Sequence, residues 1–155
     1  MHALELLKKD HEKVSELFAQ AEEAEGKKKQ QLFEQIKTEL ETHTHIEETV
    51  FYPKLEQQEE LKDIVLEAYE EHKQVKNLLR EIAALSGGSE KFDAKLKVMK
   101  ENVEHHVEEE EEEMFPQVED LFDESELEQL GKKMEAAKME YSKQQRSTSS
   151  ARSSK

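Results

Sequence analysis

The sequence predicts an all-α protein, an up-down-up-down four-helix bundle with an additional C-terminal helix. Apolar residues recur in steps of three and four along five segments, as they do on the buried face of an amphipathic helix. Charged residues make up 39% of the chain and apolar residues 34%, which suits helices with charged outer faces. Glycine and proline are scarce, at four and two residues. A chain of 155 residues is long enough for one core, so we expect a single bundle.

The first two predicted helices are separated by a short break at residues 26–29. The first spans about residues 3–23, and its core-facing stripe is Leu4, Leu7, His11, Val14 and Phe18. The second should end near Pro53, because proline disfavours a helical conformation in the residue before it. Its stripe is Leu32, Ile36, Leu40, His43, Glu47 and Val50.

The third and fourth helices flank the clearest loop in the chain, residues 86–89, where Ser89 is a plausible N-cap. The third helix spans about residues 58–85 and ends its apolar pattern at Ile82. Its stripe is Leu61, Val65, Ala68, His72, Val75, Leu79 and Ile82. The fourth should end near Pro116, and its stripe is Phe92, Leu96, Met99, Val103, His106, Glu110 and Met114.

A fifth helix follows, for which Ser125 and Glu128 form a predicted capping box. We expect it to pack on the outside of the bundle or to mediate self-association. From Arg146 the Ser- and Arg-rich tail has nothing to bury, so it is predicted to be disordered. The expected organisation is therefore a bundle over 1–122, an amphipathic helix over 123–145 and a tail over 146–155.

Composition excludes or disfavours several classes of function. A net charge of −15 disfavours nucleic acid and anionic membranes as partners. No apolar run could span a bilayer and no signal-peptide pattern is present, so we expect a cytoplasmic protein. We also expect a monomer or weak homodimer. The absence of cysteine removes disulfides, thiolate ligands and a cysteine nucleophile. A conventional hydrolase is disfavoured because neither a phosphate-binding loop nor a nucleophile elbow occurs.

One pattern occurs twice, at the ends of the second and fourth helices. In each copy a histidine precedes a proline by ten residues and a glutamate precedes it by six. A histidine and a glutamate four residues apart lie on one face of a helix, one turn from each other. At about 1.5 Å rise per residue, the four in-register histidines and two glutamates fall in one part of the bundle. These six candidate metal ligands are His11, His43, Glu47, His72, His106 and Glu110.

Each candidate also has a structural interpretation, because a single buried histidine is often only hydrogen-bonded and one His–Glu pair can arise by chance. Six residues in register at a common depth favour a metal site instead. Buried carboxylates are costly without compensation, and no lysine or arginine lies on the four stripes. Imidazole and carboxylate ligands suit iron, manganese or zinc, of which zinc offers no redox chemistry. Six donors suit two metal ions that share both carboxylates.

These motifs resemble the hemerythrin-like, or HHE cation-binding, domain. The resemblance covers about residues 3–118 and rests on Asp10-His11, His43-x-x-x-Glu47-Glu48 before Pro53, Glu71-His72, and His106-x-x-x-Glu110-Glu111 before Pro116. It implies a non-haem di-iron centre in which the four histidines are terminal ligands. It also implies that both glutamates bridge the two irons, with an oxo or hydroxo group as a third bridge.

One position departs from the oxygen-carrying members of that family, which have two ligand histidines four residues apart on the third helix. Here Ala68 and Lys76 stand at that spacing from His72. The set resembles the four-histidine variant of several bacterial hemerythrin-like proteins and of an iron-sensing ubiquitin-ligase subunit. Water, Tyr69, or a carboxylate such as Glu48 or Glu111 could fill the extra position.

The resemblance implies a di-iron protein whose partners are dioxygen, peroxide or nitric oxide. The extra position favours peroxide or nitric oxide chemistry, or metal sensing, over reversible oxygen carriage. The alternative is an iron or oxygen sensor, a binding module whose fold is ordered by metal. A third reading is a purely structural acidic bundle. Phe51, Tyr52 and Phe115 are expected to cap the core rather than to bind metal.

Overall fold

The computed structural model describes the backbone of residues 1–85 and 89–153, and the side chains of 1–85 and 89–147. Every regular element in these ranges is helical, which confirms the all-α prediction. The long helices are α1 (Ala3–Glu23), α2 (Gly26–Ile46), α4 (Lys62–Ala83), α5 (Glu90–Glu109) and α7 (Glu124–Ser153). The short elements are η1 (Glu47–Phe51), α3 (Tyr52–Leu55), η2 (Glu59–Leu61), η3 (Glu110–Met114) and α6 (Phe115–Leu121). Most of the predicted 86–89 loop lies outside the described residues.

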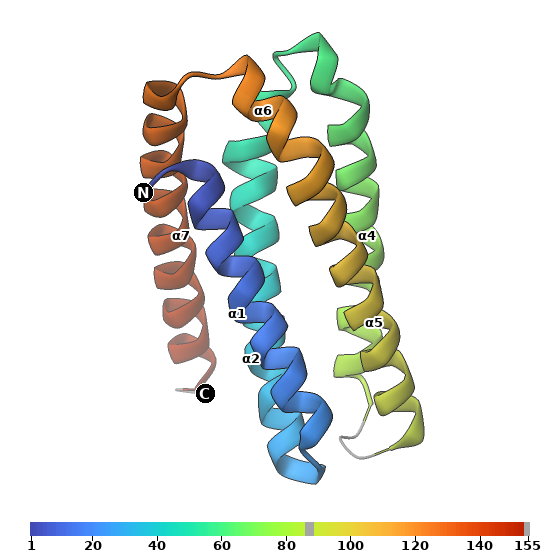
Figure 1. The fold of residues 1–155 in the computed structure, drawn as a ribbon. Helices are drawn as coiled ribbons and strands as arrows, with labels where there is room; N and C mark the ends of the chain where they lie inside the picture. The colour runs from blue at the N-terminus through green and yellow to red at the C-terminus, as the bar shows by residue number, and fades with distance from the viewer. Residues whose placement is uncertain (86–88, 154–155) are drawn as a thin grey trace.

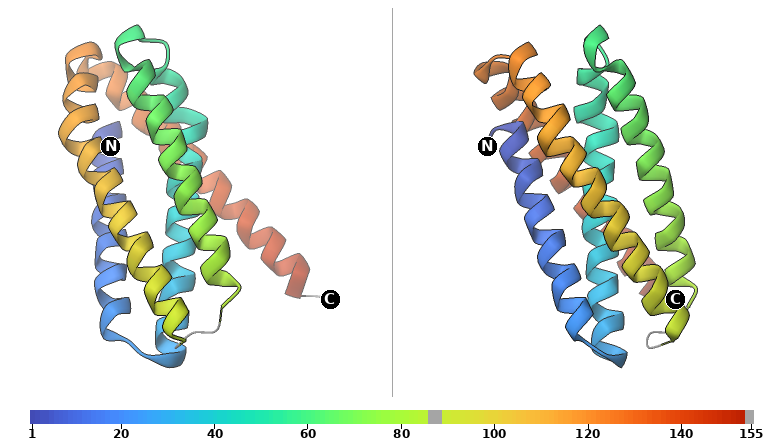
Figure 2. Two further views of the ribbon diagram at one scale, coloured as in Figure 1. Left: turned by 90° about the vertical axis from the view of Figure 1, so that its right-hand side faces the viewer. Right: turned by 45° about the vertical axis from the view of Figure 1, so that its right-hand side comes forward.

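Helices α1, α2, α4 and α5 lie side by side, and consecutive long helices run in opposite directions (Figure 1). Helix α7 lies outside this group against α1 and α2, and its C-terminal part diverges from them (Figure 2). None of the described helices is both long and apolar enough to cross a membrane.

The structure confirms one of two predicted helix starts and corrects the other. Ser89 accepts a hydrogen bond from the Phe92 N–H at 3.1 Å, which confirms it as an N-cap. The predicted capping box of Ser125 and Glu128 is wrong. Asp123 and Glu126 form the box instead, through reciprocal hydrogen bonds of 2.8 and 3.1 Å. The reason is that the buried Phe122 directly before the box fixes where the helix starts.

Other boundaries also differ from the prediction. The break between α1 and α2 falls at residues 24–25, and Gly26 begins α2 with φ +55°, a conformation that favours glycine. Helix α7 continues to Ser153 and does not end near Arg146. Extending an existing helix adds one hydrogen bond per residue without a new nucleus, so a polar segment can continue it.

The second and fourth helical segments do not end at their prolines, because each contains one π-helical turn before the proline. In η1 the Tyr52 N–H bonds the carbonyl of Glu47, and in η3 the Phe115 N–H bonds the carbonyl of Glu110. A proline cannot donate the usual hydrogen bond, and its ring crowds the preceding turn. The wider turn lets the helix continue to Leu55 in one case and to Leu121 in the other.

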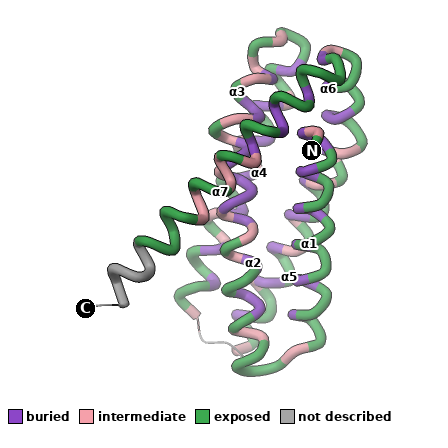
Figure 3. Tube along the Cα trace, turned by 90° about the vertical axis from the view of Figure 1, so that its left-hand side faces the viewer, coloured by how far each residue is buried: buried purple, intermediate pink, exposed green. Residues whose placement is uncertain are grey.

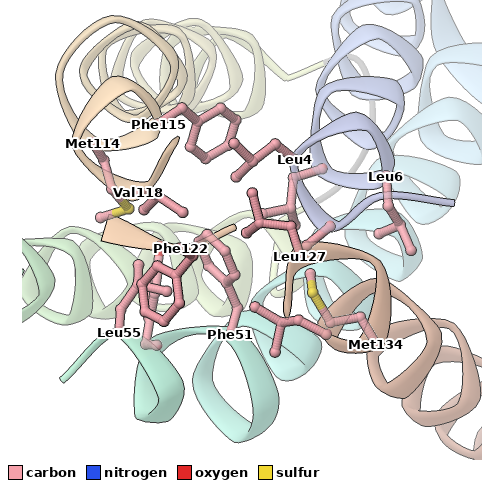
Figure 4. Close-up of a cluster of buried hydrophobic side chains, with 14 of the residues drawn as sticks. Leu4, Leu6, Phe51, Leu55, Met114, Phe115, Val118, Phe122, Leu127 and Met134 are labelled. Carbon is pink, nitrogen blue, oxygen red and sulfur yellow. The ribbon is translucent and has the colours of Figure 1, made fainter. Parts of the chain in front are cut away.

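The core consists of two apolar clusters with a polar layer between them. The cluster nearer the N-terminus includes Leu127 and Met134 of α7 (Figure 4). Leu130 of the same helix is also buried in it. The other cluster lies toward the connection between α1 and α2 and includes Phe33 and Phe92. Buried residues line the faces that the helices turn toward each other (Figure 3). Between the clusters the buried polar residues are Asp10, His11, Thr42, His43, Thr44, Glu47, His72, His106 and Glu110.

Candidate metal centre

The structure brings all six predicted site residues together in the polar layer. They form two overlapping groups, and within each group one donor atom per residue lies within 4.8 Å of the others. The first group comes from α1, α2 and the two π turns; the second joins Glu47 to residues of α4 and α5. The groups are His11, His43, Glu47 and Glu110, and Glu47, His72 and His106.

Both glutamates reach from one histidine pair to the other. Glu47 Oε1 lies 3.1 Å from His43 Nε2 and also 3.1 Å from His72 Nε2. Glu110 places Oε1 3.2 Å from His11 Nε2 and Oε2 3.2 Å from His106 Nε2. Each carboxylate therefore stands where it can bridge two neighbouring cations.

The two histidine pairs have nearly the same internal geometry. In each pair the ring centroids are 4.9 Å apart, with interplanar angles of 67° for His11–His43 and 66° for His72–His106. Phe115 stacks on His11 at 6.3 Å, and Tyr52 packs against His72 at 5.3 Å. Since Tyr52 and Phe115 each precede the proline of one repeat, the repeat in the sequence becomes an approximate symmetry of the site.

Several buried polar atoms of the layer form no hydrogen bond, even where they lie 3.1–3.2 Å from one another, because they are not aligned for one. These atoms are His11 Nε2, His43 Nε2, both carboxylate oxygens of Glu47 and Oε1 of Glu110. An unsatisfied buried polar group costs about 1–3 kcal/mol, and more when it is charged. Because these atoms are lone-pair donors that converge, a cation among them would satisfy all of them at once.

A ring of outer carboxylates fixes the histidines from behind. Each Nδ1 lies 2.6–2.9 Å from a carboxylate oxygen of a neighbouring helical segment. Such contacts orient an imidazole and leave its Nε2 facing the centre, as carboxylates commonly do for metal-binding histidines. The four pairs are His43–Asp10, His72–Glu48, His106–Glu71 and His11–Glu111.

Two lysines stand behind this ring. Lys138 of α7 donates to Asp10 Oδ1 at 2.5 Å, and Lys76 donates to Glu48 at 2.9 Å. Burial alone would raise the pKa of Asp10, but His43 and Lys138 outweigh it and hold this pKa below its usual value. Lys76 stands at one of the two spacings where a second ligand histidine could lie, and it instead supports the carboxylate that orients His72.

Tyr52 is the site residue that sequence reasoning missed. Its hydroxyl donates to Glu110 Oε2 at 2.6 Å and lies 3.3 Å from His72 Nε2 and 3.5 Å from His106 Nε2. Burial and the charges of Glu110 and Glu47 raise the pKa of this phenol well above its usual value. The sequence predicts Tyr52 to cap the core rather than to bind metal; it does lie in the core, and its hydroxyl also contacts the polar layer. In a regular α-helix, residues five apart diverge, whereas the π turn joins Tyr52 to Glu47 by a hydrogen bond.

The other suggested fillers of the extra position lie elsewhere. The Tyr69 hydroxyl donates to the backbone carbonyl of Glu48 at 3.5 Å. The carboxylates of Glu48 and Glu111 are directed at the outer nitrogens of His72 and His11.

Beside the four histidines is a small cavity of about 20 Å³. Its other walls are mainly apolar and include Val14, Leu40, Val75, Val103 and Val107. A space of this size holds about one water-sized molecule. The donor atoms therefore have a small apolar pocket next to them.

Comparisons with known proteins agree with this geometry. The sequence profile of the Hemerythrin HHE cation binding domain matches residues 2–118. A curated relative from Nostoc sp. (strain PCC 7120 / SAG 25.82 / UTEX 2576), named DNA nickase, is 30% identical over 139 residues. That match covers 89% of this chain and 39% of the nickase, so the chain spans about two fifths of that protein.

A solved structure shares the fold over nearly its whole length. It is the crystal structure of a Hemerythrin HHE cation binding domain-containing protein from Mycobacterium kansasii, at 29% identity and a TM-score of 0.79. The match covers 91% of this chain and 87% of that one. The resemblance seen in the sequence motifs is thereby confirmed.

Proposed function

This chain belongs to the hemerythrin HHE cation-binding domain family, and from that premise we propose that it is a non-haem di-iron protein that binds dioxygen or reacts with peroxide or nitric oxide. The observation that carries the proposal is the convergence of unpartnered lone-pair atoms in the layer between the two apolar clusters. In this proposal an up-down-up-down four-helix bundle holds the centre, with α7 on its outside.

The six layer residues divide naturally between two cations. His11 and His43 would hold one iron, and His72 and His106 would hold the other. Glu47 and Glu110 would contact both, since each already reaches both histidine pairs. Imidazole and carboxylate donors fit iron, while zinc or manganese would also suit these ligand types. When bound, a pair of irons supplies electrons and open positions for a small oxidant.

The residues around the centre have separate roles in this proposal. The outer carboxylates hold the proton on each Nδ1 and so keep each Nε2 directed inward. Tyr52 donates its proton to Glu110, and its hydroxyl oxygen would be a further donor for the iron at His72 and His106. The cavity beside the four histidines has room for about one water-sized molecule, which supports a small ligand such as dioxygen, nitric oxide or hydrogen peroxide.

DNA nicking is not part of the proposal. The nickase is much longer than this chain, and the net charge of −15 opposes binding to a polyanion.

The test is the metal content and visible spectrum of protein purified in air, repeated after addition of oxygen, peroxide and nitric oxide to anaerobically reduced protein. We expect two iron ions per chain, bands of an oxo bridge, and a spectral change with at least one of the three molecules. His72→Ala should lose this signal, and His45→Ala, outside the six-residue layer, should keep it. Zinc or no metal after anaerobic ferrous reconstitution would contradict the proposal.

A second candidate function is an iron or oxygen sensor. It is favoured by the contacts that connect the centre to the outer helix. Lys138 on α7 contacts Asp10, and Asp10 contacts His43. The sensor function predicts that hydrogen exchange along α7 slows severalfold when metal binds, since ligands stabilise the state that binds them. Equal exchange in α7 with and without metal would remove this candidate.

A further inference from the structure

A second cluster of possible metal donors lies outside the buried layer, where α4 faces the end of α5. One donor atom from each of Glu71, His105 and Glu109 lies within 4.8 Å of the others. His105 Nε2 is 2.9 Å from Glu109 Oε1, and these two residues are one helical turn apart. The His105 side chain is 66% exposed, and those of Glu71 and Glu109 are 20% and 28% exposed. The cluster is therefore open to ions from solvent.

The outer carboxylate ring shows why this cluster differs from an ordinary surface ion pair. Behind Asp10 stands Lys138, and behind Glu48 stands Lys76. Glu71 orients a histidine in the same way as Asp10 and Glu48, because its Oε1 lies 2.7 Å from His106 Nδ1. Within the described residues no lysine or arginine contacts Glu71 or the fourth outer carboxylate, Glu111. Only Glu71 of these two has further possible metal donors beside it, the carboxylate of Glu109 and the His105 ring.

We propose that Glu71, His105 and Glu109 form an outer site for one divalent transition-metal ion. The ion would take, behind Glu71, the place that a lysine takes behind Asp10 and Glu48. One imidazole and two carboxylates suit zinc, manganese or ferrous iron, and water can complete the coordination at an exposed site. Glu71 comes from α4 and the other two ligands from α5, so the ion also joins two helices.

The site is coupled to the buried centre through one side chain. Glu71 would hold the outer ion and the Nδ1–H of His106 together, so an outer ion reduces the negative charge that His106 experiences. The simpler reading is a solvated ion pair between His105 and Glu109 with Glu71 engaged only by His106. The two readings differ in whether a metal ion binds at His105.

Zinc alone is the probe, and the full chain is used both stripped of metal and after iron loading. Equilibrium dialysis should show that wild type binds one more zinc ion than His105→Gln, or binds it at least about tenfold more tightly. Glu109→Gln should behave like His105→Gln. The matched controls are His45→Gln and Glu112→Gln, which remove a histidine and an exposed carboxylate outside the cluster and should bind zinc as wild type does.

A second readout observes His105 directly. Its imidazole nitrogen resonances should shift on zinc addition in wild type, and this shift should survive in His72→Ala, which disturbs only the buried centre. Zinc binding by His105→Gln and Glu109→Gln that equals wild type, or His105 resonances unmoved at saturating zinc, would overturn the outer site. Because neither readout requires bound iron, the outer site and the di-iron proposal can fail separately.

Discussion

The His11/His43 pair and the His72/His106 pair occupy equivalent places in the bundle, yet only the second pair has a hydroxyl among its donor atoms. Tyr52 supplies it, while the equivalent residue beside His11 is Phe115. Both unpartnered histidine nitrogens of the layer belong to the first pair. The first half of the polar layer, around His11 and His43, therefore has the greater need of a cation. In the second half, around His72 and His106, the Tyr52 hydroxyl already contacts the histidine nitrogens.

The two halves also differ in their supports. The first is reached from outside the bundle by Lys138 of α7, and the second by Lys76 from α4, one turn beyond the histidine it supports. The additional helix is thus part of the environment of the first pair. From this difference we expect metal binding to order the first half more than the second.

The largest effect should come from removing a carboxylate that serves both halves. Glu47→Gln should abolish binding at two-metal stoichiometry and remove the rise in melting temperature that metal causes. Without metal the variant should be less stable than wild type by about 3–5 kcal/mol below the raised pKa of His43, because the Glu47 charge that stabilises the protonated imidazole is gone. Metal analysis and thermal unfolding measure both effects. Glu112→Gln is the control, and full metal content in Glu47→Gln would remove the bridging role.

The pH dependence should separate the metal-free and metal-loaded protein. Burial opposes charge on His43, but Glu47 and Asp10 outweigh it and raise its pKa to about 10. A raised histidine pKa adds stability below the ordinary value of 6.5 and loses it as pH rises toward 10. Metal must displace this proton, so its affinity should increase over the same range. Melting temperatures measured with and without metal from pH 6 to 9 would test these opposite trends. Melting temperatures that change with pH in the same way with and without metal would contradict them.

Tyr52→Phe should make the second half resemble the first. It removes one hydroxyl and leaves Glu110 Oε2 and two histidine nitrogens without that partner. We expect the metal-free protein to lose about 1–2 kcal/mol of unfolding free energy. We also expect a changed spectrum from the second metal. Tyr69→Phe, whose hydroxyl contacts only a backbone carbonyl at 3.5 Å, is the control. Identical spectra for Tyr52→Phe and wild type would exclude Tyr52 from the centre.

Phe115→Tyr should change the first half in the opposite direction. By the approximate symmetry its new hydroxyl would face Glu47, as the Tyr52 hydroxyl faces Glu110. Satisfying one unpartnered oxygen should raise the metal-free unfolding free energy by about 1 kcal/mol. Denaturant titration of this variant and of the Tyr52→Phe/Phe115→Tyr double variant measures it. An unfolding free energy of Phe115→Tyr that is lower than that of wild type would argue against the symmetry.

Lys138→Met should affect only the surroundings of the first pair, because it removes the cation behind Asp10. We expect metal affinity of the first half to fall by about tenfold, the lower range for loss of an outer partner. Calorimetric titration measures it, and Lys133→Met, an exposed residue of the same helix, provides the comparison. Equal losses in both variants would show that the contact to Asp10 has no specific role.

The sequence was sufficient for the helices and for the six residues of the layer, because both depend on the period of the α-helix. That period separates His11 and His72, which are buried, from His105, which is exposed. The assumption of a regular α-helical period also explains why the contact of Tyr52 with the layer was not predicted. A π turn changes which residues share a face, and it leaves no recognised pattern in the sequence.

Contacts between distant segments could not be read from the sequence either. The ring of outer carboxylates joins residues up to 100 positions apart, as in His11–Glu111, and the Lys138–Asp10 contact joins α7 to α1. Periodicity gives the face of a helix but not the partner that the face meets. The capping box at Asp123 shows the same limit at short range, because the burial of Phe122 decided between two overlapping patterns.

The most direct test of the central claim is the number of iron ions bound per chain after anaerobic ferrous reconstitution, measured for wild type and for Glu47→Gln. The account predicts two iron ions in wild type and the loss of the paired centre in the variant. An unchanged iron content in Glu47→Gln, or no iron bound by wild type, would contradict a di-iron centre held by this layer.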